Sequence, residues 1–159
     1  MKRRRAHRIT FVAAGAYNIA WGCYAVLDPQ WFFRVTGLPL SNSPQIFACL
    51  GMVLGLYGLL YLEVARRPET GWPIAAVGLA GKVLGPVGLA WLIVTGTWPV
   101  ATVVIIVSND LIWWLPFAVY LRDAWPAYRN PGAGPDTDLR VDSQVSPRAA
   151  TGSATTLDQ

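Results

Sequence analysis

Hydrophobic residues fill four long stretches of the chain, and short polar segments separate them. The four stretches cover residues 9–27, 45–65, 72–95 and 98–121. Each stretch has about the length, roughly 17 to 25 residues, that an α-helix needs to cross a hydrocarbon core of roughly 30 Å. The pattern therefore predicts an all-α protein, an integral membrane four-helix bundle formed by residues 1–126.

Two segments outside the spans have compositions of their own. Residues 29–35 hold three aromatic side chains and the single charge of Arg34, a composition typical of a short interfacial helix between the first and second spans. Residues 127–159 are rich in proline, glycine, serine, threonine and aspartate, with scarcely any large apolar side chain. We expect this second segment to be a disordered cytoplasmic tail.

Composition and charge agree with a membrane protein. Hydrophobic residues make up 53% of the chain and charged residues only 14%, which excludes an ordinary soluble domain. The basic residues gather before the first span, between the second and third, and after the fourth: Lys2, Arg3, Arg4, Arg5, Arg8, Arg66, Arg67, Arg122 and Arg129. Because cytoplasmic loops carry the excess of Lys and Arg, we expect both termini on the cytoplasmic side of the inner membrane. The basic N-terminus adjoins a span, so it is expected to orient the chain rather than to bind nucleic acid.

Polar side chains from three spans fall at one depth. At a helical rise of about 1.5 Å per residue, Asn18, Lys82 and Asp110 lie about 14, 15 and 16 Å from the cytoplasmic ends of their spans. An isolated charge at this depth costs roughly 2.5 to 3.5 kcal/mol, so Lys82 and Asp110 are expected to pair. Asn109 and the phenol of Tyr57 complete the predicted polar layer.

Two interpretations of this layer remain open. The first is structural: an ion pair that fixes the register of the helices. The second is functional: a ligand-binding or proton-responsive pocket, because pairing favours the charged forms and burial the neutral ones. Pro86 adds to the interest of the site, because a proline inside a helix leaves the carbonyl four residues earlier, that of Lys82, without its donor. Pro116 leaves the carbonyl of Ile112 free in the same way.

Small residues recur where helices have to approach each other closely. Two GxxxG pairs are present, Gly51 with Gly55 and Gly81 with Gly85, and two further glycines flank Asn18 on the first span. Backbone contact at small residues drives much of the association of membrane helices. We expect these glycines to pack helices within one chain rather than to form a dimer.

Signals for chemistry are sparse. Cys23 and Cys49 are the only cysteines, and they are interpreted as small apolar side chains, with a disulfide or a quinone-linked thiol pair as the alternative. His7 is the only histidine and belongs to the basic N-terminal run, so no metal or haem site is predicted. The chain contains no phosphate-binding loop or nucleophile elbow, and no catalytic residue is assigned.

Short motifs resemble a known class of proteins. The chain carries Tyr17-Asn18 in its first span, Gly81-Lys82 in its third, and Asn109-Asp110 before Trp113-Trp114 in its fourth. This plan resembles small four-helix bacterial membrane proteins, some of which are grouped with the DoxX-like family, over residues 9–121. The resemblance implies a small subunit of a membrane redox complex.

The sequence thus predicts an accessory or small-ligand-binding membrane subunit, with a binding role favoured over an enzymatic one. Its polar midplane pocket would be formed by Asn18, Tyr57, Lys82, Asn109 and Asp110. The alternative is an oligomeric proton-coupled small transporter or quinone-linked redox component, in which Asp110 exchanges protons and Lys82 tunes its affinity. Expected partners are the lipid bilayer, a membrane protein or a second copy of the chain, and a quinone, lipid or small metabolite.

Overall fold

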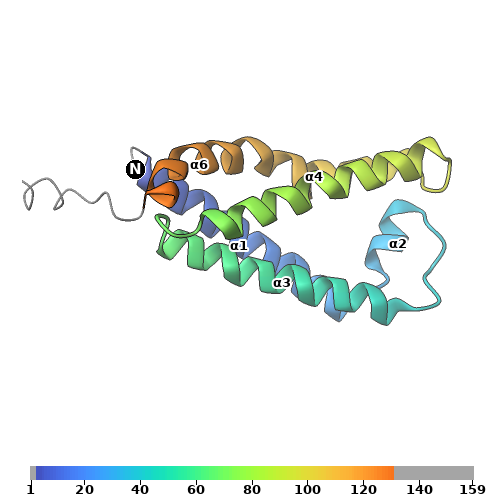
Figure 1. The fold of residues 1–159 in the computed structure, drawn as a ribbon. Coiled ribbons are helices and arrows are strands. Elements are labelled where there is room, and N and C mark those ends of the chain that lie inside the picture. Colours follow the sequence, from blue (N-terminus) through green and yellow to red (C-terminus); the bar gives the residue numbers. More distant parts are fainter. Residues whose placement is uncertain (1–2, 131–159) are drawn as a thin grey trace, which may run out of the picture. The chain divides into compact units, whose positions relative to one another are not determined.

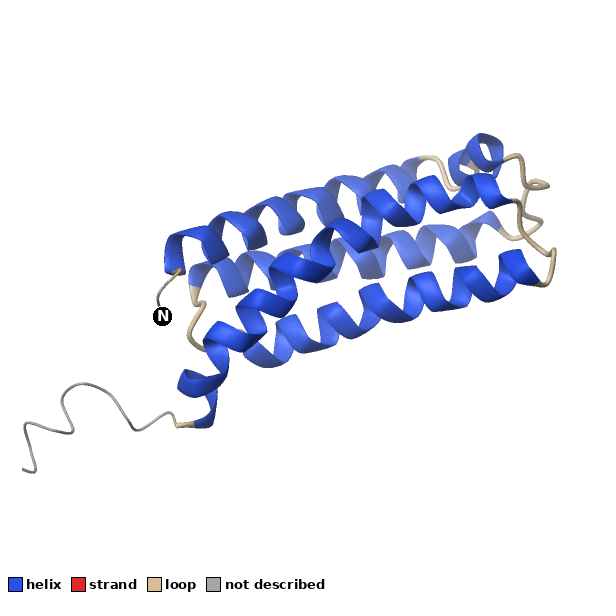
Figure 2. Ribbon diagram, turned by 90° about the horizontal axis from the view of Figure 1, so that it is seen from above, coloured by secondary structure: helices blue, strands red, loops and turns tan. Residues whose placement is uncertain are grey.

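The computed structural model describes residues 3–130, and every regular element in that part of the chain is a helix. Four of its helical segments are long and apolar enough to cross a membrane (Figures 1 and 2). The elements in chain order are α1 (Arg4–Leu27), α2 (Trp31–Thr36), α3 (Pro44–Arg66), α4 (Trp72–Val94), η1 (Val100–Thr102), α5 (Val103–Ile106), η2 (Val107–Leu111) and α6 (Ile112–Arg129).

The helix bounds match the predicted spans except at the two ends of the series. The first helix begins at Arg4 rather than at residue 9, because long basic side chains at a helix end can reach water. The last helix continues to Arg129, beyond the predicted end at residue 121 and through the first residues of the predicted tail. Residues 131–159 of that tail lie outside the described residues.

The sequence predicted a single helix for the fourth apolar stretch. The structure instead divides this stretch into four consecutive elements. It begins as the 3-10 turn η1, continues as the short helix α5, widens into the π-helical turn η2 and only then becomes α6. Pro116, in the first turns of α6, cannot donate to the preceding turn, which interrupts the hydrogen-bond ladder close to η2. Wide π turns of this kind are frequent at functional sites.

The predicted short helix between the first two spans is present as α2. It ends at Thr36 and is capped by Gly37, whose φ of 73° is a left-handed conformation that glycine adopts without strain. The buried ring of Phe32 lies 5.3 Å from the ring of Phe47 in α3 and 5.5 Å from that of Trp98, centroid to centroid. These contacts place α2 against the ends of the long helices.

Helices α1 and α3 pack backbone to backbone through glycine. A Cβ atom added to Gly22 would lie 2.5 Å from the carbonyl oxygen of Gly51, and one added to Gly58 would lie 2.7 Å from that of Gly15. Glycine is therefore required at this crossing, and the expected close packing is present at Gly51. The second GxxxG pair makes no such contact, because a Cβ on Gly81 would meet nothing within 4 Å and one on Gly85 would meet only the side chain of Asp110. The contact on α3 uses Gly51 and Gly58, whereas a Cβ on Gly55 would meet nothing within 4 Å.

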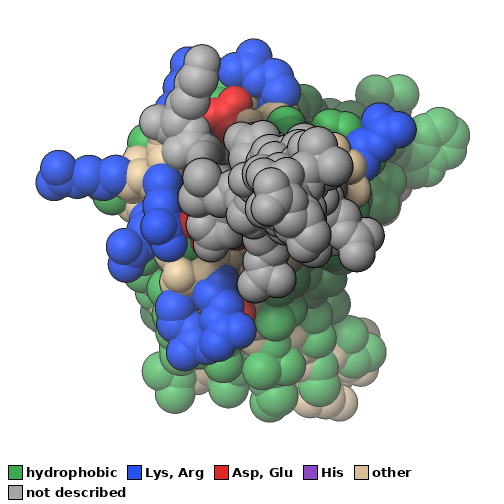
Figure 3. All heavy atoms as spheres, turned by 60° about the vertical axis from the view of Figure 1, so that its left-hand side comes forward, with side chains coloured by type: hydrophobic (Ala, Val, Ile, Leu, Met, Phe, Trp, Pro, Cys, Tyr) green, Lys and Arg blue, Asp and Glu red, His purple; other side chains and the backbone are tan. Residues whose placement is uncertain are grey.

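An aromatic core joins the helices in the half of the molecule where α1 begins. The ring of Phe11 lies 4.6 Å from the rings of both Phe117 and Tyr120, and Tyr61 lies 5.1 Å from Phe117. The phenol of Tyr61 also fits against Gly78 of α4, where a Cβ would come within 2.5 Å of its hydroxyl. Basic side chains gather at this end of the described chain, and hydrophobic side chains cover its sides (Figure 3).

Candidate functional site

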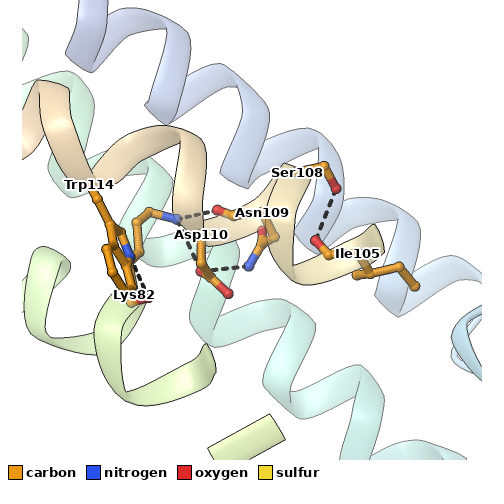
Figure 4. A network of polar contacts seen from close by, with 6 residues as sticks. All are labelled: Lys82, Ile105, Ser108, Asn109, Asp110 and Trp114. Atoms are coloured by element: carbon orange, nitrogen blue, oxygen red, sulfur yellow. Dashed lines mark hydrogen bonds and ion pairs between the residues drawn. The ribbon is translucent and has the colours of Figure 1, made fainter. Parts of the chain in front are cut away.

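Lys82 and Asp110 form a buried ion pair between α4 and η2. The Nζ atom of Lys82 lies 3.6 Å from Oδ1 of Asp110 and donates a hydrogen bond of 2.8 Å to the carbonyl oxygen of Asn109 (Figure 4). Lys82 is 5% exposed and Asp110 is 8% exposed. The predicted pairing of these two charges is therefore confirmed, and the π turn contributes a backbone acceptor to it.

The two oxygens of the Asp110 carboxylate have different surroundings. Oδ1 accepts a hydrogen bond of 3.0 Å from Nδ2 of Asn109 and faces Lys82. Oδ2 accepts no hydrogen bond from any residue between 3 and 130, and it lies 3.3 Å from the position that a Cβ on Gly85 would take. The second oxygen therefore faces a glycine of α4 rather than a donor.

Trp114 joins Lys82, Asn109 and Asp110, and these four residues are called the polar group below. The role of Trp114 was not predicted. Its Nε1 atom donates a hydrogen bond of 2.8 Å to the carbonyl oxygen of Lys82. Pro86 leaves this carbonyl without its usual backbone donor, so the indole replaces the missing N–H. A signal was present in the sequence, because Trp114 follows Asp110 by four residues and therefore lies on the same helix face.

Two members of the predicted layer lie apart from this group. Asn18 is 2% exposed, but within the described chain its side chain has no hydrogen bond to Lys82, Asn109 or Asp110. It lies between Gly15 and Gly22 on the buried face of α1, where these two glycines pack against α3. Tyr57 is half-buried and packs against the aromatic core, with its ring 6.2 Å from that of Tyr61.

A cavity of about 370 Å³ extends from the polar group towards α2. Asn109 and Asp110 lie among its lining residues, and Asp110 is the only charged residue in the described lining. Aliphatic side chains and glycines of α4 and α5 form most of the wall. Three aromatic side chains also line it: Trp21, Phe32 and Trp98. The cavity is therefore apolar over most of its surface, with a carboxylate at one place.

The cavity opens on the side of the helices. Gly85 and Gly88, both in its lining, are exposed, and Leu84 beside them is 69% exposed. Towards α2 the rings of Phe32 and Trp98, which are in contact, stand over it. The exposed part of the lining thus lies on the apolar flank of α4.

A second polar cluster lies at the other end of the helices, where sequence reasoning assigned no role. His7 is 3% exposed, and its Nε2 atom lies 3.0 Å from Oδ2 of Asp123 in α6. The hydroxyl of Tyr120 donates a hydrogen bond of 2.8 Å to the carbonyl oxygen of Pro68. His7 precedes the buried Phe11 by four residues, a spacing that places it on the buried face of α1.

The remaining candidates for chemistry lie outside both clusters. Cys23 and Cys49 are free thiols, and both are exposed. Ser108 is exposed, and its hydroxyl donates to the carbonyl of Ile105 in its own helix. Among the residues that the structure describes, no group of histidine, cysteine, aspartate and glutamate side chains is arranged to hold a metal ion.

Comparison with protein-family models, with curated proteins and with solved structures finds no match for this chain. The resemblance to DoxX-like proteins stays a prediction. The transporter and quinone-linked alternatives also stay predictions.

Proposed function

We propose that this chain is a multi-pass inner-membrane protein, a four-helix bundle with both termini cytoplasmic, that binds a small and mainly apolar ligand as an accessory membrane subunit. The ligand site is the cavity beside Asp110. The observation that carries the proposal is an apolar cavity of about 370 Å³ whose lining includes one buried carboxylate.

The composition of the cavity supports a binding site. Small-molecule sites are typically apolar clefts of roughly 300 to 1,000 Å³ with a few placed polar groups, and this cavity has that size and lining. Charged residues within a membrane segment are costly and mark functional sites by default. Lys82, Asn109 and Trp114 hold Asp110 and its neighbouring backbone in place, which gives the polar end of the site a defined geometry.

The opening of the cavity indicates where the ligand comes from. Exposed glycines and the exposed Leu84 border the cavity on a helix flank that would face lipid. An apolar molecule dissolved in the bilayer can enter there without crossing a polar surface. The proposed ligand is therefore a membrane-soluble molecule rather than an ion or a sugar.

Two glycines of α4 provide a matched test of the proposal. A Cβ on either Gly88 or Gly81 would meet nothing within 4 Å, but only Gly88 lines the cavity. We expect Gly88→Leu to fill the cavity and to weaken binding of the probe para-butylphenol by about tenfold or more, whereas Gly81→Leu changes it by less than about twofold. Calorimetric titration of the protein in lipid nanodiscs, with empty nanodiscs as the blank, measures both affinities. Equal affinities of the two variants would contradict the proposed site.

A further inference from the structure

The carboxylate of Asp110 leaves one hydrogen-bonding position open at the cavity. Oδ1 is engaged by Asn109 and Lys82, whereas Oδ2 accepts no hydrogen bond from the described residues and faces the glycine wall of α4 at Gly85. Asp110 is 8% exposed, so water has little access to it. Oδ2 is therefore free to accept a hydrogen bond from a ligand in the cavity that Asp110 lines. A ligand group that donates to this charged oxygen would form a charge-assisted hydrogen bond, which is stronger than one between neutral groups.

No side chain of the described lining donates a hydrogen bond to Oδ2 in this structure. The hydroxyl of Thr102 donates to the carbonyl oxygen of Pro99 at 2.7 Å, and the amide of Asn109 already donates to Oδ1 of the same carboxylate. Within the described lining, these two residues and Asp110 are the ones with polar side chains apart from the tryptophans. Oδ2 of Asp110 is thus a hydrogen-bond acceptor that no described lining residue engages.

The charge balance of the site decides between a neutral donor and a cation. Lys82 already neutralises Asp110 at 3.6 Å, and no other described lining residue is charged. A cationic ligand would bring a third charge into a site that is already balanced and shielded from water, which costs free energy. A hydroxyl group donates one hydrogen bond and adds no charge.

We infer that the ligand is a neutral, mainly apolar alcohol or phenol whose hydroxyl donates a hydrogen bond to Oδ2 of Asp110. The three aromatic side chains of the lining, Trp21, Phe32 and Trp98, suit a ligand with a ring, because aromatic rings attract each other in edge-to-face and offset arrangements. This inference rests on the proposed function, since it names the class of ligand for the same cavity.

Three probes of nearly equal size separate the possibilities. They are para-butylphenol, its methyl ether para-butylanisole, which lacks the donor, and the cation para-butylbenzylamine. In calorimetric titrations of the nanodisc protein, corrected for partition into empty nanodiscs, we expect the phenol to bind about tenfold more tightly than the ether, the effect of one hydrogen bond to a charged group. The amine is expected to bind no more tightly than the ether.

The variant Asp110→Asn tests which atom makes the contact. It keeps the shape of the side chain, but it removes the charge and replaces one oxygen by a nitrogen that donates. We expect the advantage of the phenol over the ether to fall to within about twofold in this variant. If the variant does not fold, the comparison of the three probes on the unchanged protein still decides the question.

The outcomes separate this inference from the proposed function. Equal binding of phenol and ether, with both weakened by Gly88→Leu, overturns the inference and leaves the ligand site in place. Tighter binding of the amine than of the phenol overturns the inference that the ligand is neutral. If Gly88→Leu weakens none of the probes, both the site and the class of ligand are refuted.

Discussion

At the scale of single residues, the polar group depends on a hydrogen bond between helices that replaces one missing within α4. Pro86 removes the backbone donor for the carbonyl of Lys82, and Trp114 of α6 supplies the replacement at 2.8 Å. The same lysine donates to the backbone of η2 through its side chain. Lys82 thus joins α4 to the fourth span through both its side chain and its backbone.

The indole contribution can be measured by substitution. Trp114→Phe leaves the carbonyl of Lys82 without a donor, and we expect it to lower the free energy of unfolding by about 1 to 3 kcal/mol, the cost of an unsatisfied buried polar group. Trp113→Phe is the matched control, because the Nε1 atom of Trp113 is buried and has no hydrogen-bond partner in the described chain. Unfolding in mixed micelles, followed by circular dichroism, compares the two. Equal losses in both variants would show that the hydrogen bond contributes nothing beyond the size of the indole.

At the scale of helices, glycines determine which faces meet. Gly15 and Gly22 of α1 lie against Gly58 and Gly51 of α3, seven residues apart on each helix. This repeat keeps one face of each helix in contact over two turns. Towards α2, by contrast, α4 and the broken fourth span border the cavity. Helices α1 and α3 are therefore in close contact, whereas a cavity separates part of α4 from the segment that precedes α6.

Two alanine variants test the close pair. At Gly58 a Cβ would lie 2.7 Å from the backbone oxygen of Gly15, whereas at Gly55 it would meet nothing. We expect Gly58→Ala to destabilise the protein by about 1 to 3 kcal/mol, because the helices must move apart. Gly55→Ala is expected to be neutral or to stabilise it by up to about 1 kcal/mol through helix propensity. The same micelle unfolding assay applies, and a Gly58→Ala protein as stable as Gly55→Ala would refute the close contact.

At the scale of the folded unit, polar contacts and basic side chains mark one end of the long helices. The imidazole of His7 contacts the carboxylate of Asp123, and Nε of Arg4 lies 3.0 Å from Oε1 of Glu69. The hydroxyl of Tyr120 donates a hydrogen bond to the carbonyl oxygen of Pro68. The start of α1, the turn between α3 and α4 and the end of α6 therefore lie together. Because basic residues favour the cytoplasmic side, this arrangement supports the proposed orientation.

Labelling of single cysteines tests that orientation. Asn42 precedes α3 and Thr70 lies in the turn before α4, and both are exposed at opposite ends of α3. In a background with Cys23→Ser and Cys49→Ser, we expect a membrane-impermeant maleimide to label Asn42→Cys in intact cells. Thr70→Cys should be labelled only after lysis. The reverse pattern would place both termini outside.

The four long apolar helices, the charged end and the pairing of Lys82 with Asp110 were predictable from the sequence. These properties depend on quantities that each segment carries by itself. They are the length of apolar helix that matches a bilayer, the placement of basic residues, and the cost of an isolated charge in hydrocarbon. Depth along a helix follows from the rise per residue, so the level of the polar group was also accessible.

Only the tertiary structure decided which side chains of that level meet. Depth is one coordinate, and the direction of a side chain also depends on how its helix is rotated and crossed against its neighbours. Asn18 therefore makes no hydrogen bond to Lys82, Asn109 or Asp110 in the described chain although it lies at the level of Lys82, and Trp114 binds the carbonyl of Lys82 although it lies one turn away from Asp110. The cavity likewise depends on where neighbouring helices part, which no single segment encodes.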